Sequence, residues 1–213
     1  MSNNNPYPVA IGNLYGPKVV YKMPLYQRKY CWKPEKELTD FKEDFVRIFE
    51  SLTSSNPENV FLGAVVLQSD GANYSATQSS EFTVIDGQQR ITTIYLTIAA
   101  LSQYAYEKGW VNDADIIISG YLISRGITNM NQPILEPTNQ DTNQFYEIIN
   151  QIKSGSNKFK IPPSGSGDKS GQMTEAYDFI KKEIVEVLME DMGGSKHSFD
   201  QLVSCFLNRF VIA

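Results

Sequence analysis

The stretch that decides the fold is residues 82–93, Phe-Thr-Val-Ile-Asp-Gly-Gln-Gln-Arg-Ile-Thr-Thr. Its first four residues are a short apolar run of the β type, and a helical pattern begins directly after the polar centre. We therefore predict a strand, a tight polar turn and a helix with no longer linker. Gly87 lies at the turn, where the missing side chain lets the backbone bend or approach a ligand closely. The predicted buried face of the helix comprises Ile91, Ile94, Tyr95, Ile98, Leu101 and Ala105.

The start of this helix is chemically suited to phosphate. The first N–H groups of a helix have no intrahelical partner, and the helix dipole adds about half a positive charge there. Arg90 supplies a planar fork of donors, and Thr92 and Thr93 supply hydroxyl groups nearby. The residue types therefore predict a phosphate cradle next to Gly87.

Three polar side chains at the edge of this cradle indicate chemistry as well as binding. Asp86 is a candidate for holding Mg²⁺ or orienting a water, and Gln88 and Gln89 are candidates for positioning a water or contacting a sugar or base. The residue types alone leave a structural alternative open. In that alternative Asp86 caps the helix, Arg90 pairs with a surface carboxylate and the glutamines are solvated.

A second cluster, residues 23–33, mixes basic and aromatic side chains in the sequence Met-Pro-Leu-Tyr-Gln-Arg-Lys-Tyr-Cys-Trp-Lys. Its cations are Arg28, Lys29 and Lys33, and its rings are Tyr26, Tyr30 and Trp32. Cations of this kind bind phosphates and rings stack on bases, so the cluster is a candidate nucleic-acid surface. The alternative is that the rings belong to the core and the cations to its rim, and for Trp32 alone core packing is favoured.

The other expected elements follow the spacing of apolar residues. A short strand at Lys18–Met23 ends before Pro24, and a helix opened near Pro34 continues to about Leu52. The continuous apolar run Val60–Leu67 predicts a strand buried on both faces. A further helix is expected after Asp141, which is a candidate for its cap, and others are expected over residues 176–188 and 199–207. A hairpin is expected to pair Tyr121–Ser124 with Pro133–Glu136, and polar loops are expected at residues 69–80 and 154–172.

Length and composition indicate one large domain, or one domain with an extension, because the chain has 213 residues with 41% hydrophobic and 20% charged residues. We divide it into a flexible arm (1–14), a nucleotide-binding core (15–110) and a helical extension (111–213). The chain stops at Arg209-Phe-Val-Ile-Ala, a strand that has just begun, so we expect it to be part of a longer protein.

Charge, hydropathy and rare residues exclude several classes of function. The net charge of −5 gives no global attraction to nucleic acid. No apolar run reaches the roughly 18 residues of a membrane helix, and the start of the chain does not resemble a signal peptide, so we expect no membrane partner. Cys31 and Cys205 form no CxxC pair, which favours reduced thiols in a cytoplasmic protein. The single histidine, His197, excludes a multi-histidine zinc site and an HNH nuclease centre in this chain.

Three segments, in the same order, resemble the N-terminal domain of GmrSD-type restriction endonucleases, whose wider relatives are the ParB/sulfiredoxin-like domains. The segments are Pro24–Trp32, Phe61–Leu67 and Val84–Thr93. The Asp-Gly-Gln-Gln-Arg core of the third segment is the most specific of them. Weaker similarity through Pro133–Ile149 and Met173–Ile184 extends the resemblance over nearly the whole chain after about Leu14.

This resemblance implies the fold class α/β (α+β), a ParB/sulfiredoxin-like core with a small mixed sheet and added helices. It also implies that the core binds and hydrolyses nucleoside triphosphates in a defence system that restricts modified phage DNA. It implies a nucleotide site at Asp86–Arg90, with Gln27 and Arg28 facing the same pocket. Cutting of DNA would fall to an HNH-type nuclease module, in the same chain or in a partner chain.

Three functions follow as alternatives. The first is a regulatory domain that binds and hydrolyses a nucleoside triphosphate, with Mg²⁺ as cofactor. Its expected catalytic residues are Asp86, Gln88, Gln89 and Arg90, and its expected nucleotide-binding residues are Gln27, Arg28, Gly87, Arg90, Thr92 and Thr93. The second is a module that senses modified DNA through Lys29, Tyr30, Trp32 and Lys33. The third is a scaffold that docks a nuclease.

Overall fold

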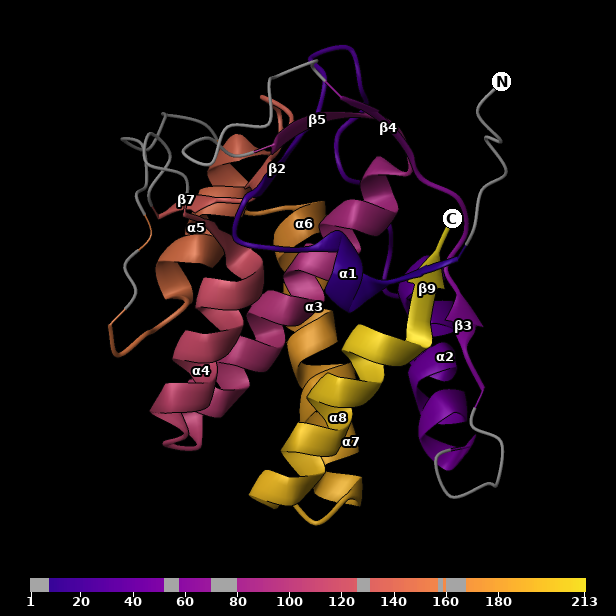
Figure 1. The fold of residues 1–213 in the computed structure, drawn as a ribbon, viewed down its shortest axis with the longest axis vertical. Coiled ribbons are helices and arrows are strands. Elements are labelled where there is room, and N and C mark those ends of the chain that lie inside the picture. The colour runs from indigo at the N-terminus through magenta and orange to yellow at the C-terminus, as the bar shows by residue number, and fades with distance from the viewer. Residues whose placement is uncertain (1–7, 52–57, 70–79, 126–130, 157–158, 160–167) are drawn as a thin grey trace.

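A mixed sheet and a group of helices form two layers, with most of the helices on one side of the sheet (Figure 1). The computed structural model describes residues 8–51, 58–69, 80–125, 131–156, 159 and 168–213. The main sheet has the strand order β4-β5-β2-β8. Its strands are β2 (Val19–Lys22), β4 (Val66–Ser69), β5 (Ser80–Asp86) and β8 (Leu135–Glu136). Strand β2 is parallel to β5 and β8, and β4 is antiparallel to β5, so the expected α/β class with a small mixed sheet is confirmed. The finer expectation of a ParB/sulfiredoxin-like core stays a prediction.

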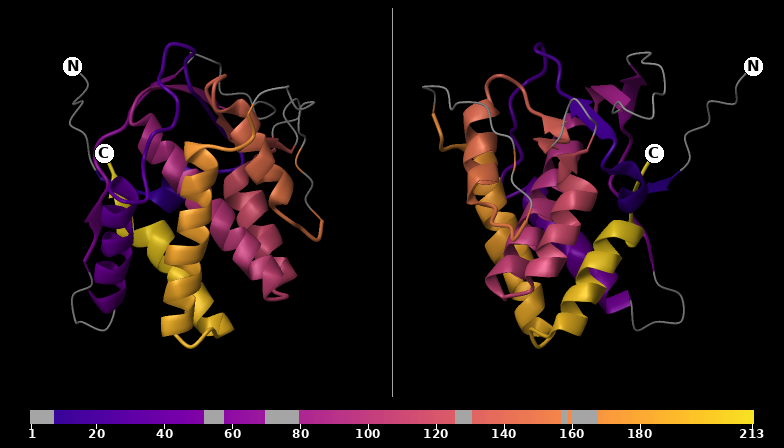
Figure 2. Two further views of the ribbon diagram at one scale, coloured as in Figure 1. Left: turned by 180° about the vertical axis from the view of Figure 1, so that it is seen from behind. Right: turned by 60° about the vertical axis from the view of Figure 1, so that its left-hand side comes forward.

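Helix α3 (Gln88–Glu107) follows β5 after a single residue and runs through the middle of the helical layer. Its side chains are buried from Ile91 to Ala105. The helix carries apolar and small side chains on all of its faces, so neighbouring elements pack around its whole circumference. These neighbours include α4 (Val111–Ile117), α6 (Gln172–Phe179) and the π-helical segment η2 (Ile180–Glu186). In the left view of Figure 2, which is seen from behind, α6 lies in front of α3. The predicted strand, turn and helix are confirmed, although the helix is buried all round and not on one face.

The outer helices follow their predicted apolar spacing. Helix α2 (Glu37–Ser51) begins three residues after Pro34 and buries Leu38, Phe41, Phe45 and Ile48. The remaining helical segments are η1 (Ile118–Leu122), α5 (Thr142–Gln151), α7 (Val187–Asp191) and α8 (Lys196–Arg209). The helices expected over residues 176–188 and 199–207 therefore exist as parts of longer ones. None of the helices in the described ranges is long and apolar enough to cross a membrane.

A second sheet joins segments from the two ends of the described chain. Its order is β1-β9-β3, with β1 (Val9–Ala10), β9 (Phe210–Ile212) and β3 (Val60–Phe61). The expectation of a flexible arm over residues 1–14 is wrong for residues 9–14. Strand β1 pairs with β9, and Ile11 in the short helix α1 (Ile11–Leu14) is fully buried, because β9 supplies backbone partners and the core accepts the apolar side chain. Residues 1–7 lie outside the described ranges.

The apolar run Val60–Leu67 is not one buried strand, contrary to the prediction. It is split between β3 and β4, with Gly63 at φ +104° between them. Phe61 is 58% exposed and Val66 is also exposed. The physical reason is that the two halves pair with different sheets, β3 with β9 and β4 with β5. The segment Gly63–Val65 therefore crosses from one sheet to the other, directly beside the site described below.

The middle of the chain forms the predicted hairpin in shortened form. Strand β6 (Ile123–Ser124) pairs with β7 (Gln132–Pro133), whereas residues 135–136 leave the hairpin and join the main sheet as β8. Most of the polar loops expected at residues 69–80 and 154–172 lie outside the described residues. The division of the chain into a core and an extension at residue 110 stays a prediction.

Candidate functional site

The turn between β5 and α3 depends on Gly87. Its backbone has φ +87° and ψ 14°, in the left-handed region that residues with a side chain rarely adopt. A Cβ atom at this position would lie 2.7 Å from Cγ2 of Val65 and 3.1 Å from the carbonyl oxygen of Ala64. The turn is therefore confirmed, and the close neighbour that requires a glycine is the crossing segment Gly63–Val65.

The first turn of α3 is left open. Gly87 is the N-cap residue, and no side chain caps the helix, so the alternative in which Asp86 caps it is wrong. The N–H of Ile91 donates to the Gly87 carbonyl oxygen at 3.0 Å. The N–H groups of residues 88–90 precede this bond and have no intrahelical partner, which together with the helix dipole makes this end of α3 electropositive.

A cleft of about 220 Å³ opens at this end of α3. It is lined by Gln27, Arg28, Trp32, Asp86, Gly87, Gln88, Gln89 and Arg90. The two clusters picked out from the sequence therefore meet, and each of the four expected catalytic residues lines the same cleft. Of the expected nucleotide-binding residues, Thr92 and Thr93 are not part of its lining.

Thr93 and Tyr30 form a buried pair in place of a ligand contact. Their hydroxyl oxygens lie 2.8 Å apart and share a hydrogen bond. Tyr30 is 2% exposed, and burial raises the pKa of its hydroxyl well above its ordinary value. The predictions that Thr93 binds nucleotide and that Tyr30 stacks on DNA are therefore wrong, because helix α3 is buried on every side and takes both residues into the core. Thr92 is also buried.

The two glutamines hold the loop that carries Arg28. Nε2 of Gln88 donates to the Arg28 carbonyl oxygen at 3.1 Å. Gln89 accepts the N–H of Cys31 at Oε1 (2.8 Å) and donates from Nε2 to the Lys29 carbonyl oxygen (3.3 Å). Both side chains are buried, so the alternative in which they are solvated is wrong. Gln89 uses both ends of its amide on the loop, whereas Oε1 of Gln88 has no partner among the described residues.

Arg90 also lines the cleft, and it contacts the crossing segment. Its Nη1 donates to the Ala64 carbonyl oxygen at 3.0 Å, and a Cβ atom on Gly63 would lie 2.7 Å from its Nε. The guanidinium therefore packs on the backbone of the crossing segment. A carbonyl group carries no negative charge, and among the described residues no carboxylate pairs with Arg90, so its alternative as a partner of a surface carboxylate is not found there.

Gln27, the residue before Arg28, anchors the loop that carries Arg28 to the main sheet. Gln27 donates from Nε2 to the Ile85 carbonyl oxygen at 2.9 Å, next to Asp86, which is exposed at the end of β5. Trp32 is half-buried and packs against the core, as favoured from the sequence, and it also lines the cleft. The cations Arg28, Lys29 and Lys33 are exposed.

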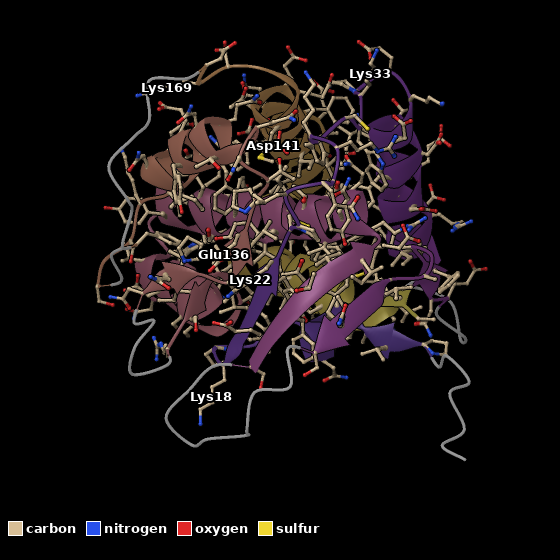
Figure 3. The ribbon with its side chains drawn as sticks, turned by 90° about the horizontal axis from the view of Figure 1, so that it is seen from above. Lys18, Lys22, Lys33, Glu136, Asp141 and Lys169 are labelled. Atoms are coloured by element: carbon tan, nitrogen blue, oxygen red, sulfur yellow. The ribbon has the colours of Figure 1, made fainter. Side chains whose placement is uncertain are left out.

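Asp141 belongs to this region in a role that the sequence did not indicate. It was expected to cap α5, but its side chain makes no capping bond. Its Oδ2 instead accepts the N–H of Tyr30 at 2.8 Å and the hydroxyl of Thr138 at 2.9 Å. Burial raises the pKa of the Asp141 carboxyl above its ordinary value, although these two donors lower it. In Figure 3, which looks onto this side from above, Asp141 lies well inside the outline and Lys33 lies close to its edge.

The cleft suits a metal ion only together with a ligand that supplies further donor atoms. Among the described residues there is no group of three or more His, Cys, Asp or Glu side chains placed so that they could hold a metal ion. Asp86 is the one carboxylate in the described lining of the cleft. Because Mg²⁺ in nucleotide sites takes one or two carboxylates together with phosphate oxygens and waters, Asp86 fits such an ion once phosphate is bound.

Comparison with known proteins identifies the family of this chain. The sequence profile of the N-terminal domain of the GmrSD restriction endonuclease matches residues 11–208, a range that contains the residues that line the cleft and the main sheet. A search of curated proteins finds no significant match. The chain therefore belongs to the GmrSD restriction endonuclease N-terminal domain family and is a component of a restriction system.

Proposed function

We propose that this domain binds a nucleoside triphosphate in the cleft at the start of α3 and hydrolyses it, and that it thereby regulates a cytoplasmic restriction system directed against modified DNA. The observation that carries the proposal is the uncapped start of α3 in a cleft that both Arg28 and Arg90 line. Free helical N–H groups, the helix dipole and two guanidinium groups form one anion-binding surface.

The size of the cleft supports placing the phosphates inside it and the nucleoside at its mouth. Pockets that enclose a whole drug-sized ligand measure roughly 300–1,000 Å³. The cleft of about 220 Å³ is smaller. The half-buried ring of Trp32 lines the same cleft and offers an apolar face to a base.

In this proposal Asp86 holds Mg²⁺ together with the phosphates, and Arg90 stabilises the charge that develops on the transferred phosphoryl group. Most of the catalysis is then positioning and charge stabilisation. The glutamines of the motif act mainly by fixing the loop of Arg28, because three of their four amide atoms are bonded to that loop. DNA cleavage falls to an HNH-type module elsewhere, in the same protein or a partner, since the chain has one histidine.

The test is calorimetric titration of the purified chain with GTP, CTP, ATP and UTP, each with Mg²⁺, followed by measurement of phosphate release. Arg90→Ala is expected to weaken binding by about tenfold or more, because it removes from the cleft a charged side chain that would contact the phosphates. Arg47→Ala is the matched control, since Arg47 is an exposed arginine on α2 that bonds to Asp44 at 2.7 Å. Unchanged affinity in a folded Arg90→Ala protein, or no binding of any of the four nucleotides to the wild type, overturns the proposal.

A module that senses modified DNA is the second candidate, and the exposed Arg28, Lys29 and Lys33 favour it. Tyr26, which is 75% exposed, adds a ring beside these cations. Its signature is DNA binding that weakens steeply with salt and prefers modified bases. The variant Lys29→Ala/Lys33→Ala should abolish this binding and leave nucleotide affinity unchanged, so the two candidates are separated by one pair of titrations.

A further inference from the structure

A small cavity, the inner cavity, adjoins the cleft. Its volume is about 10 Å³, close to that of one probe sphere and therefore sufficient for a single water molecule. Three of its lining residues, Arg28, Gln88 and Gln89, also line the cleft. Its other lining residues, Asp141 among them, have no part in the proposed nucleotide site.

One buried acceptor on a residue that lines the inner cavity lacks a partner among the described residues. Gln88 is 8% exposed, and its Nε2 is fixed as the donor to the Arg28 carbonyl oxygen. Oε1 of Gln88 is therefore an acceptor, and it has no hydrogen-bond partner among the described residues. If the amide were flipped, its oxygen would face the Arg28 carbonyl oxygen, and the hydrogen bond between the two residues would be lost. Exchanging the two amide atoms therefore does not satisfy the buried side chain. Buried acceptors in native proteins are bonded to protein or to ordered water in the large majority of cases.

The charges around the cavity decide which kind of ligand fits. Asp141, 4% exposed, lines it together with Thr92, whose hydroxyl can donate. Arg28, a cation, and Asp141, an anion, are both among the residues that line the cavity, so the cavity favours neither a cation nor an anion. A neutral molecule that both donates and accepts satisfies the whole set, and water is the one that the volume admits.

We propose that the inner cavity binds one internal water molecule, which donates to Oε1 of Gln88 and to the carboxylate of Asp141. The water then joins α3 to the residue that precedes α5. Asp141 also holds the N–H of Tyr30, and Gln88 also holds the Arg28 carbonyl oxygen, so both ends of the bridge act on the same loop. Asp141 is accordingly a positioning residue that sets where Arg28 stands in the cleft. This consequence rests on the proposed function, whereas the water itself does not.

The water is tested by a high-resolution crystal structure of the wild-type chain without nucleotide. We expect a density peak within hydrogen-bond distance of Gln88 Oε1 and of the Asp141 carboxylate. A cavity that is filled by a side chain, or that lacks such a peak, overturns the hydration site whatever the nucleotide experiments give.

The positioning role is tested with two substitutions of Asp141. Asp141→Ala should weaken nucleotide binding by about tenfold, because the loop loses its anchor and Arg28 shifts. Asp141→Asn keeps an acceptor for the Tyr30 N–H and should restore most of the affinity. The control is Asp115→Ala, because Asp115 is a carboxylate that holds another loop through the N–H groups of Gly155 and Ser156. It should lower the melting temperature and leave affinity unchanged.

The outcomes separate this inference from the proposed function. If Arg90→Ala abolishes binding and Asp141→Ala leaves it unchanged in a folded protein, the positioning role is wrong and the nucleotide site stands. If the wild type binds no nucleotide, both the proposed function and the positioning role are wrong, and the hydration site is judged by the crystal structure alone.

Discussion

Arg90 is held by a hydrogen bond from its Nη1 to the carbonyl oxygen of Ala64, at 3.0 Å. Ala64 in turn belongs to a segment whose backbone is hydrogen-bonded to β9 and to the residue that follows it, Ala213. The N–H of Leu62 donates to the Val211 carbonyl oxygen at 2.9 Å, and the N–H of Val65 donates to the Ala213 carbonyl oxygen at 2.8 Å. The position of the proposed phosphate-binding arginine therefore depends on residues 211–213, far from it in the sequence.

The first prediction concerns Gly63, on which the Arg90 side chain rests. In Gly63→Ala the new Cβ would lie 2.7 Å from Arg90 Nε, and the backbone would keep a strained φ of +104°. We expect a loss of about 1–3 kcal/mol of stability from the strain and weaker nucleotide binding from the displaced guanidinium. Thermal melting and calorimetry measure the two effects. Gly16→Ala is the control, because nothing lies within 4 Å of a Cβ there. Equal affinities of the two variants would show that Arg90 is not positioned by Gly63.

The second prediction separates bracing from catalysis at Gln89. In Gln89→Met the side chain keeps its length and loses both of its loop bonds, those to Cys31 and Lys29. We expect stability to fall by about 1–3 kcal/mol and Kd to rise several-fold, with the rate at saturating nucleotide nearly unchanged. Gln68→Met on the exposed side of β4 serves as the control. A large fall in the saturated rate at unchanged Kd would instead place Gln89 on the attacking water.

The third prediction tests the buried position of Tyr30. Tyr30→Phe removes the hydroxyl that bonds with Thr93 and leaves the ring in the core. We expect a loss of about 1–3 kcal/mol in the free energy of unfolding, because the Thr93 hydroxyl is left unpaired. Denaturant titration measures it. Tyr26→Phe should have no effect on stability, since that side chain is 75% exposed. If Tyr30→Phe is as stable as the wild type, the hydrogen bond contributes nothing to the fold.

The local order of elements around Gly87 could be predicted from the sequence because each signal there is short-range. The apolar run before Asp86, the glycine at the turn and the apolar helix after it all act on neighbouring residues. The same reasoning failed for Val60–Leu67, because the division of that run is imposed by two distant strands, β9 and β5. No local pattern marks which strand a segment will join.

The candidate site shows the same limit. Asp86, Gly87 and Arg90 were found because they follow one another in the chain, and Gln27 and Arg28 came from the resemblance. For Tyr30 the sequence left two alternatives, a ring that stacks on DNA and a ring in the core, and could not decide between them because it does not show that α3 is covered on all sides. The sequence predicts Asp141 as a helix cap, since an aspartate before a helix looks the same whether it caps the helix or reaches a loop from a distant part of the chain.

The last prediction concerns the pH dependence of stability through Asp141. Burial raises the pKa of its carboxyl in the folded protein above the unfolded value of about 3.9. The folded state therefore takes up this proton first as pH falls. The contribution of Asp141 to stability is then largest below the unfolded pKa, and it is lost as pH rises through the folded pKa. We expect the free energy of unfolding of the wild type, minus that of Asp141→Asn, to fall between about pH 3 and pH 7. Denaturant titrations of both proteins across this range measure the difference, in which the other titrating groups cancel. A difference that is flat, or that rises with pH, would mean that the Tyr30 and Thr138 donors outweigh burial and hold the folded pKa at or below the unfolded one.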